Sequence, residues 1–297
     1  MTAREEGFLL LTSNLGDPNR RPLTTAQARS LAQRVATAPR IHEDRALESR
    51  DLTAMGYSLE MAEHIVALLE DTVLLEHYLR RGQRLDCHAI SRVGEAYPQI
   101  LHNRLGLDAP GCLWTRGDQN LLEKPAVALV GSRDLKQDNL TFAKEVGRQA
   151  ARQGFVLVSG NARGADRAAQ DSCLDAGGEV ISIVADELVK YEPKGHILYV
   201  SEDGFDLPFS SQRALSRNRL IHCMGLRTFV AQCGYQRGGT WDGTVKNLRF
   251  GWSPVHCFED GSEAIKLLQN MGAEGVKLEE LHNFVGLELP IFRIFDQ

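Results

Sequence analysis

The chain has 297 residues, which is enough for about two domains and for a hydrophobic core that needs neither a disulfide nor a metal to hold it together. Hydrophobic residues make up 43%, charged residues 25%, and the mean hydropathy is −0.26, which excludes a largely disordered chain. No apolar run approaches the ~18 residues of a membrane span, and the opening residues lack the apolar region of a secretory signal. We therefore expect a cytoplasmic protein with no membrane partner.

Cysteine and histidine spacing gives no sign of a metal site. The six cysteines contain no CxxC pair, and the nine histidines contain no HxxxH or HExxH spacing. Dispersed thiols in a cytoplasmic protein are expected to be reduced. The sequence predicts no metal ion, no cofactor and no disulfide framework.

The charge is unevenly distributed. The formal net charge is −5, yet residues 210–250 carry seven basic residues and one acid, Asp242. A net +6 within an acidic chain indicates a local surface for a polyanion.

The first 84 residues are predicted to form a small helical domain. Thr24 and Thr25 can cap a helix over Ala26–Ala36, whose apolar residues recur with helical spacing. Further helical stretches end at Gly56 and Gly82. We expect this domain to serve in packing or interaction and to carry no chemistry.

From Ala126 onward, strands and helices alternate. Residues 85–125 are expected to form a connecting lobe with one short strand around Cys112–Thr115. A long insertion, Asp186–Pro208, is predicted before a helix over about Gln212–Met224. The predicted strands are Ala126–Val130, Phe155–Val158, Val180–Val184, Thr228–Ala231 and Pro254–Phe258. This alternation predicts an α/β fold with a doubly wound, mostly parallel, Rossmann-like sheet over residues 85–270, and a short C-terminal tail, 271–297.

Three loops are expected to lie at the carboxyl ends of these strands, where such sheets bind ligands. Each combines glycines or hydroxyls with arginine, and these groups suit a phosphate oxygen. The candidate residues are Gly131, Ser132 and Arg133 in the first loop; Ser159, Gly160, Arg163, Gly164 and Asp166 in the second; and Arg213, Arg217, Asn218 and Arg219 in the third.

Each of these loops also has a purely structural interpretation. The first can be a mere tight turn, and Asp166 can be the N-cap of a helix. Arg217 and Arg219 do not share a helix face, so one of them can pair internally while the other meets a ligand. Neither a GxGxxG fingerprint nor a P-loop is present, which disfavours NAD binding and ATP hydrolysis.

The three loops, in this order and at this spacing, resemble the DNA-processing protein family DprA, also called Smf, over about residues 95–258. The pieces that carry the resemblance are Tyr97-Pro98, Leu113-Trp114, Gly117-Asp118, Val130–Arg133, Ser159–Asp166 and Arg217–Ile221. The resemblance implies a non-enzymatic protein that binds single-stranded DNA without sequence preference in a basic groove. It also implies a RecA-type recombinase as partner, which the protein loads onto DNA during DNA uptake or recombination, and a homodimer.

The sequence departs from the family pattern in several places, one of which is the glycine-rich segment Gly238–Thr244. Ala214-Leu215 stand where the family has Phe-Pro, so a base-stacking aromatic is absent there unless Phe205, Phe209 or Tyr235 substitutes for it. Gln232 replaces the acidic residue that follows the next strand. A divergent branch with a specialised role is compatible with these changes, and the pathway stays open.

A glycine-rich segment supports a second class of function. Gly238, Gly239 and Thr240 are further candidates for phosphate binding, and the segment resembles the phosphate loop of LOG nucleoside-monophosphate phosphoribohydrolases. Such a hydrolase needs a carboxylate beside the breaking glycosidic bond, and Asp242 is the only local one. The alternatives are therefore this hydrolase or a related nucleotide sensor. We assign no catalytic residue, and we attribute Trp241, Trp252, His222 and His256 to core packing.

Overall fold

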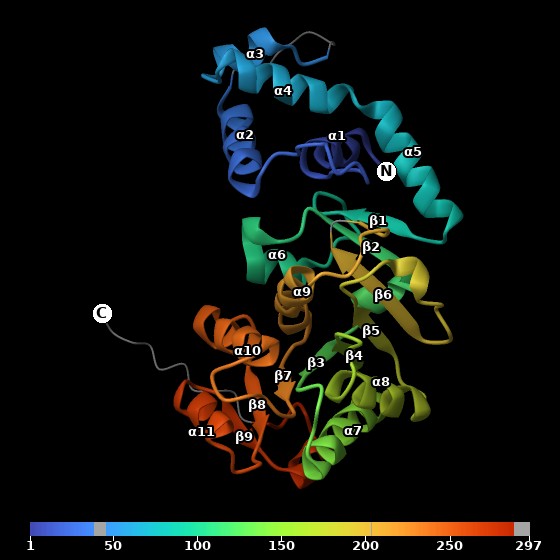
Figure 1. Ribbon diagram of the computed structural model, residues 1–297, viewed down its shortest axis with the longest axis vertical. Coiled ribbons are helices and arrows are strands. Elements are labelled where there is room, and N and C mark those ends of the chain that lie inside the picture. Colours follow the sequence, from blue (N-terminus) through green and yellow to red (C-terminus); the bar gives the residue numbers. More distant parts are fainter. Residues whose placement is uncertain (39–45, 203, 288–297) are drawn as a thin grey trace. The chain divides into compact units, whose positions relative to one another are not determined.

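The computed structural model describes residues 1–38, 46–202 and 204–287 (Figure 1). The chain divides into two compact units. Unit 1 consists of Met1–Tyr97, Gly106–Trp114 and Glu202–Leu207, and unit 2 consists of Pro98–Leu105, Thr115–Ser201 and Pro208–Gln297. Each unit thus draws on segments that are distant in sequence.

Unit 1 is built mainly from helices with side-chain caps. Thr2 and Thr24 each form a capping box, and Ser58 caps a third helix, which satisfies backbone N–H groups that a helix start leaves open. The elements are α1 (Ala3–Thr12), α2 (Thr25–Thr37), α3 (Ser49–Ala54), α4 (Leu59–Glu70), α5 (Thr72–Arg84), β1 (His88–Ser91) and the 3₁₀ turn η1 (Gly106–Asp108). The helix predicted after Thr24 is confirmed, whereas α1 was not predicted.

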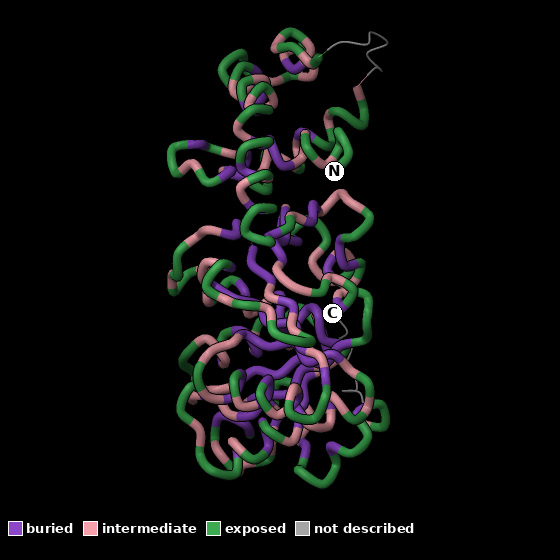
Figure 2. The backbone as a smooth tube through the Cα atoms, turned by 90° about the vertical axis from the view of Figure 1, so that its right-hand side faces the viewer, coloured by how far each residue is buried: buried purple, intermediate pink, exposed green. Residues whose placement is uncertain are grey.

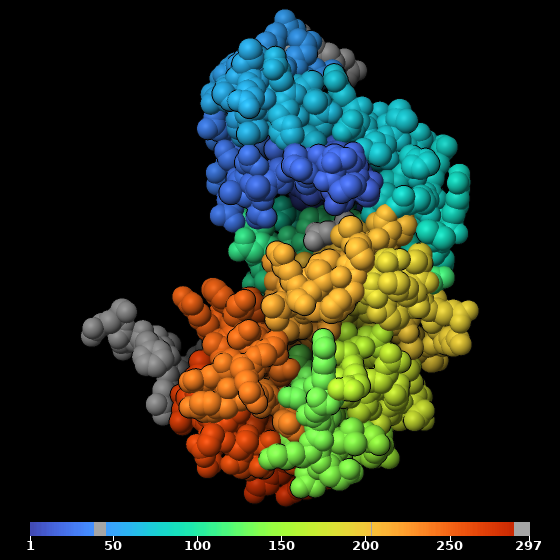
Figure 3. All heavy atoms as spheres, in the orientation of Figure 1, coloured from blue at the N-terminus to red at the C-terminus, as the bar shows by residue number. Residues whose placement is uncertain are grey.

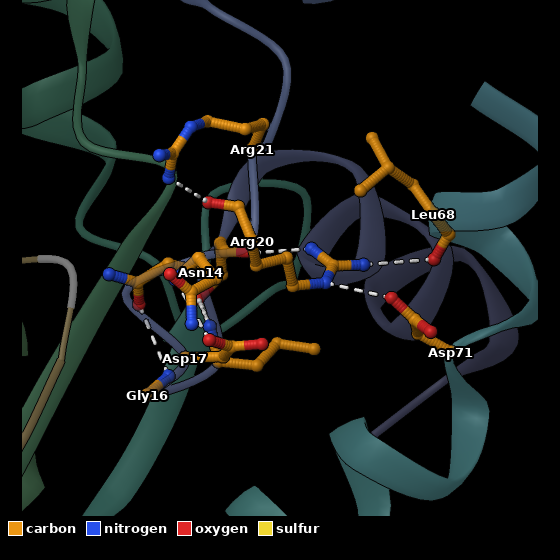
Figure 4. A network of polar contacts seen from close by, with 10 residues as sticks. Asn14, Gly16, Asp17, Arg20, Arg21, Leu68 and Asp71 are labelled. Carbon is orange, nitrogen blue, oxygen red and sulfur yellow. Dashed lines mark hydrogen bonds and ion pairs between the residues drawn. The ribbon is translucent and has the colours of Figure 1, made fainter. Parts of the chain in front are cut away.

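Arg20 holds the connection after α1 against the end of α4 (Figure 4). Its buried guanidinium donates from Nε to Asp71 at 3.0 Å and to the carbonyl oxygens of Ser13 at 2.6 Å and Leu68 at 3.0 Å. A buried charge is tolerated because its donors are satisfied. The contact complements a small apolar core that includes Leu52 and Ile65.

An aromatic cluster encloses the Glu202–Leu207 segment within unit 1. The Phe205 ring lies 4.9 Å from that of Tyr78 and 4.7 Å from that of Trp114, measured between centroids. The Tyr78 hydroxyl donates to Asp206 at 2.7 Å. Phe205 is fully buried in this cluster and is therefore not an exposed surface for stacking a base.

Unit 2 contains the parallel sheet. Its elements are α6 (Gln99–Leu105), β2 (Cys112–Gly117, whose first half belongs to unit 1), η2 (Gln119–Glu123), β3 (Ala126–Val130), α7 (Gln137–Arg152), β4 (Val156–Ser159), α8 (Ala165–Asp175), β5 (Val180–Ile183), η3 (Leu188–Lys190), β6 (Ile197–Glu202), α9 (Ser211–Met224), β7 (Thr228–Val230), α10 (Gly239–Phe250), β8 (Val255–Phe258), α11 (Glu263–Asn270), β9 (Glu274–Val276) and η4 (Leu278–His282). The strand order is β1-β2-β6-β5-β4-β3-β7-β8-β9.

The central strands are buried on both faces. Every residue of β3, β4, β5 and β7 is buried, and Figure 2 shows buried residues gathered in the interior with exposed ones around them. Pairings from β6 through β9 are parallel, as expected for continuous apolar runs. The doubly wound α/β fold is confirmed. The predicted insertion Asp186–Pro208 contributes β6, and the stretch assigned to a tail contributes β9.

The described residues contain neither a membrane-spanning helix nor a metal-ligand cluster. In that part of the chain, no helix combines the length and apolar character needed to cross a membrane, and no group of three or more potential ligands is placed to hold a metal ion. All six cysteines are buried as free thiols.

Candidate functional site

The winding of the sheet reverses beside β3. From β3 the chain runs through α7, β4, α8 and β5 toward one edge, whereas β7, β8 and β9 extend toward the other. Strands β3 and β7 are neighbours in parallel register, with Val130 opposite Val230. The loops that leave their carboxyl ends therefore diverge and open a crevice, the usual ligand position in such folds.

Two adjoining pockets occupy this crevice. The larger, of about 680 Å³, is lined by residues from the loops after β3 and β7, from α9 and from the start of α10. The smaller, of about 280 Å³, lies over the loop after β4. Both share Arg133, Ala162, Phe209 and Arg217, so they form one continuous depression. In Figure 3 the surface is hollowed where the green residues after β3 face the gold and orange helices α9 and α10.

The first loop is fixed to the loop after β7. The backbone N–H of Ser132 donates to the carbonyl oxygen of Gln232 at 2.9 Å, and the Ser132 hydroxyl donates to the same oxygen at 3.2 Å. The Gln232 side chain accepts from the Lys136 backbone at 3.0 Å and donates to the Asp134 carbonyl at 3.2 Å. Gln232, noted above as a departure, thus organises the loop that presents Arg133.

The second loop docks against the first through its backbone. Ala165 N–H at the start of α8 donates to the carbonyl oxygen of Ser132 at 3.2 Å. Gly164 has φ +93°, and a Cβ there would meet the backbone of Ser132 and Arg133. Glycine is therefore required at position 164 for the close approach of the two backbones. In the same loop, the Asp166 carboxylate accepts a hydrogen bond from the backbone N–H of Ala162 at 3.2 Å.

Arg217 lies beneath the depression. Its guanidinium is buried, donates to the carbonyl oxygen of Ile183 at 2.8 Å and fills the space where a Cβ on Gly160 would stand. Burial raises the pKa of Asp166 while the positive charge of Arg217 opposes that rise. Burial likewise lowers the pKa of Arg217, while the negative charge of Asp166 opposes that decrease. Arg217 is thus held in the interior by the carbonyl oxygen of Ile183 while it also lines both pockets.

The exposed arginines lie at the rim. Arg133 and Arg237 are exposed residues of the larger pocket, and neither forms a hydrogen bond or ion pair with a side chain in the described part of the molecule. Arg163 lines the smaller pocket and pairs with Asp134 at 2.8 Å, with both side chains largely exposed. Arg237 was not among the predicted residues, although its place in the basic segment 210–250 was a signal for it.

Several predicted residues support the depression without lining it. Arg213 donates to the carbonyl oxygens of Ala185 at 3.0 Å and Pro208 at 3.1 Å, and to the Ser201 hydroxyl at 2.7 Å. The predicted residues that line neither pocket are Ser159, Gly164, Arg213 and Arg219, whereas Gly131, Ser132, Arg133, Gly160, Arg163, Asp166, Arg217, Asn218, Gly238, Gly239 and Thr240 line one or both.

The glycine-rich segment serves helix packing as well as the pocket. Ideal Cβ atoms on Gly239 and Gly243 would lie 3.2 Å from Asn218 Nδ2 and His222 Nε2 respectively, so the missing side chains let α10 approach α9 closely. Asn218 Nδ2 also donates to the Gly239 carbonyl oxygen at 3.0 Å. The N-terminus of α10 has no side-chain cap and opens on the pocket, which Gly238 also lines.

Of the three aromatic candidates Phe205, Phe209 and Tyr235, only Phe209 lines the depression. It lines both pockets and is 54% exposed. Tyr235 is equally exposed but lines neither pocket, and Phe205 is buried in unit 1. Tyr191, which was not predicted, lines the smaller pocket and stacks on Tyr199 at 5.0 Å between centroids.

Comparison with known proteins gives concordant matches. The sequence model of the family described as DNA recombination-mediator protein A matches residues 88–280. DNA processing protein DprA of Streptococcus pneumoniae is 36% identical over 89 residues, which is 30% of this chain and 31% of that protein. Protein Smf of Escherichia coli is 27% identical over 199 residues, 63% of this chain and 52% of that protein. The chain therefore matches about a third to a half of the length of these relatives.

Solved structures show the same fold. The X-ray structure of DNA processing protein A from Streptococcus pneumoniae aligns with a TM-score of 0.64 at 24% identity, covering 86% of this chain and 95% of that one. DNA processing protein A from Helicobacter pylori, described for its single-stranded DNA binding mode, aligns with a TM-score of 0.55 at 22% identity, covering 66% of this chain and 94% of that one.

Proposed function

Because the chain belongs to the DNA recombination-mediator protein A family, we propose that unit 2 binds single-stranded DNA without sequence preference, as a step in DNA recombination. The observation that carries this proposal is the continuous depression at the carboxyl edge of the sheet. There, exposed Arg133 and Arg237 stand beside exposed Phe209. Guanidinium groups suit backbone phosphates, and an aromatic face accepts any base.

The shape of the depression supports a strand as ligand. Phe209 and Arg133 line both pockets, so one base can stack on Phe209 while phosphates on either side reach Arg133 and a second cation. For the larger pocket that cation is Arg237, and for the smaller it is Arg163. Several linked phosphates thus engage a site that a single nucleotide only partly fills.

The carboxylates favour binding over catalysis. Asp134 is paired with Arg163, and Asp166 is buried with a raised pKa beside the charge of Arg217. Asp242, the residue that a phosphoribohydrolase would require, is exposed and does not line either pocket. We therefore propose a binding role. A RecA-type recombinase and a second copy of this chain are further proposed partners, on the basis of the family to which the chain belongs.

Arg133→Ala and Arg237→Ala test the site. Each removes one rim cation, so each is expected to weaken binding of all sequences alike and to flatten the slope of log affinity against log salt by about 0.7. Fluorescence anisotropy with labelled 20-mers of several sequences, at a series of salt concentrations, measures both effects. A duplex competitor shows whether the site selects single strands.

Arg152→Ala is the matched control. Arg152 is an exposed arginine in the last position of α7, at the opposite end of that helix from the depression. Its removal changes the net charge equally, so it is expected to leave affinity and salt slope near those of the unmodified chain. Equal losses for all three variants, or no loss at Arg133 and Arg237, contradict the site.

A further inference from the structure

An exposed aromatic stack lies at the C-terminal end of α10. Phe250 is the last residue of that helix and is 61% exposed. Its ring stacks on that of Trp252, with 5.5 Å between the centroids and 17° between the planes. Trp252, attributed above to core packing, is only half-buried. Burial in the core therefore does not account for this pair of rings.

Hydrogen bonds fix the turn that carries the two rings. Gly251 has φ +63°, the left-handed conformation in which α10 ends, and its N–H donates to the carbonyl oxygen of Asn247 at 2.8 Å. The Asn247 side chain is buried and accepts from the backbone N–H of Ser253 at 2.8 Å. The rings are thus presented to solvent in a preset arrangement, which lowers the entropic cost of binding a flat ligand.

Cations lie on the same face of α10 as Phe250. Asp242, Lys246 and Arg249 are exposed and follow one another at spacings of four and three residues, which places them on one side of a helix. The Arg249 guanidinium lies 5.6 Å from the centroid of the Phe250 ring. Neither Lys246 nor Arg249 forms a hydrogen bond or an ion pair with any described residue. We call Lys246, Arg249, Phe250 and Trp252 the α10 stripe.

The α10 stripe leads away from the depression. The first residues of α10, Gly239 and Thr240, line the larger pocket, whereas the aromatic stack is at the opposite end of the helix. Twelve residues, at about 1.5 Å each, span about 18 Å. A stacked strand carries one phosphate per about 3.4 Å, so this length corresponds to about five nucleotides.

We propose that the α10 stripe is a second contact surface for single-stranded DNA, over which the strand held in the depression continues until one of its bases stacks on Phe250. This inference rests on the proposed function. Lys246 and Arg249 complement the phosphates of a strand, and an aromatic ring accepts the face of any base. An apolar protein segment would cover the rings but would leave both cations without acceptors, so a strand matches the whole surface better.

Two variants of the full chain are tested on strands of two lengths. A 6-mer occupies the depression, whereas a 20-mer also reaches the α10 stripe. For the 20-mer, we expect Phe250→Ala to lower affinity about tenfold and Lys246→Ala/Arg249→Ala to flatten the slope of log affinity against log salt by about 1.4. Both variants are expected to bind the 6-mer as the unmodified chain does, which also shows that they are folded.

A 20-mer of abasic sites separates stacking from charge. Phe250→Ala is expected to leave its affinity unchanged, because this strand has no bases to stack, whereas Lys246→Ala/Arg249→Ala weakens it. Phe250→Trp retains an aromatic face and is expected to bind the normal 20-mer like the unmodified chain. Lys144→Ala, at an exposed lysine of α7, is the charge control and is expected to change neither affinity.

The inference is overturned if Phe250→Ala binds the normal 20-mer as tightly as the unmodified chain, or if it weakens the 6-mer and the 20-mer equally. A loss on the abasic strand equal to that on the normal strand contradicts base stacking in the same way. Failure of the proposed function has a different signature: the 6-mer then does not bind the unmodified chain, and Arg133→Ala leaves the affinity for the 20-mer unchanged.

Discussion

At the scale of single residues, the arginines of the site divide into two roles. Arg133 and Arg237 are exposed at the rim of the larger pocket, whereas Arg217 is buried and donates to the carbonyl oxygen of Ile183. An exposed arginine can meet a phosphate with little effect on folding, but a buried one compensates a buried acid. The two classes are therefore expected to respond differently to the same substitution.

Arg217→Ala is expected to destabilise the fold by about 1–3 kcal/mol at neutral pH, because it leaves the buried carbonyl oxygen of Ile183 without its donor and removes a positive charge that lowers the pKa of Asp166. The folded-state pKa of Asp166 is already raised above 3.8. Its stabilising contribution is thus complete below pH 3.8 and is lost as the pH rises through the folded-state pKa. Removal of Arg217 raises the folded-state pKa of Asp166 further and increases the loss of stability at neutral pH. Thermal unfolding followed from pH 4 to 8 measures it.

The double variant Asp166→Asn/Arg217→Ala is the control for this mechanism. Without an ionisable group at position 166, stability is expected to lose the additional pH dependence and to recover in part at neutral pH. If the single and double variants follow the same pH profile, the destabilisation comes from lost packing over Gly160 and not from the charge of Asp166.

At the scale of elements, glycines set the distance between helices that carry the site. Gly147 on α7 lies against the backbone of Ala169 on α8, where an added Cβ would meet the Ala169 carbonyl oxygen. Gly239 and Gly243 allow the corresponding close approach of α10 to α9. Since α8 and α10 begin at the depression, their packing fixes the loops there.

Gly147→Ala is expected to lower stability by about 1–3 kcal/mol, because overpacking against a rigid backbone outweighs the better helix propensity of alanine. Gly7→Ala is the matched comparison: Gly7 is also inside a helix, α1, but has no neighbour within 4 Å of an added Cβ. It is expected to gain about 0.5–1 kcal/mol. Thermal unfolding of both variants tests the pair, and a loss at Gly7 or a gain at Gly147 would contradict this explanation.

At the scale of the whole molecule, charge is segregated. The chain has a net charge of −5, yet residues 210–250 carry a net +6. These residues include α9, α10 and the rim arginine Arg237. Of the basic residues in this segment, Arg237, Lys246 and Arg249 are exposed, whereas Arg217 is buried. The exposed cations are expected to attract DNA to this part of an otherwise negative chain.

A recombination mediator is expected to speed assembly of a RecA-type recombinase on DNA already coated by single-strand-binding protein. The lag before DNA-dependent ATP hydrolysis by the recombinase measures this. The unmodified chain is expected to shorten the lag, Arg133→Ala to restore it and Arg152→Ala to act like the unmodified chain. Light scattering on the isolated chain tests the homodimer. An unchanged lag with DNA binding intact would separate strand binding from recombinase loading.

The sequence alone determined the α/β alternation, because a buried parallel strand is a continuous apolar run such as Ala126–Val130, whose neighbours in the chain suffice to define it. The sequence also predicted that the residues of the three loops lie close together, because the carboxyl ends of parallel strands meet at one edge of the sheet. Strand β6 was not predicted, because its short hydrophobic run Ile197–Val200 lies within a stretch that contains many polar residues and was interpreted as an insertion.

Only the tertiary structure decided which of these residues line the depression. The pattern around Arg217 is the same whether its guanidinium turns outward or, as it does, toward the Ile183 carbonyl oxygen. His222 was attributed to core packing and is fully buried, yet it also lines the larger pocket. Its Nδ1 contacts Asn247, which is 25 residues away in the chain. Burial and hydrogen-bond direction depend on partners distant in the chain, and a local sequence pattern does not contain them.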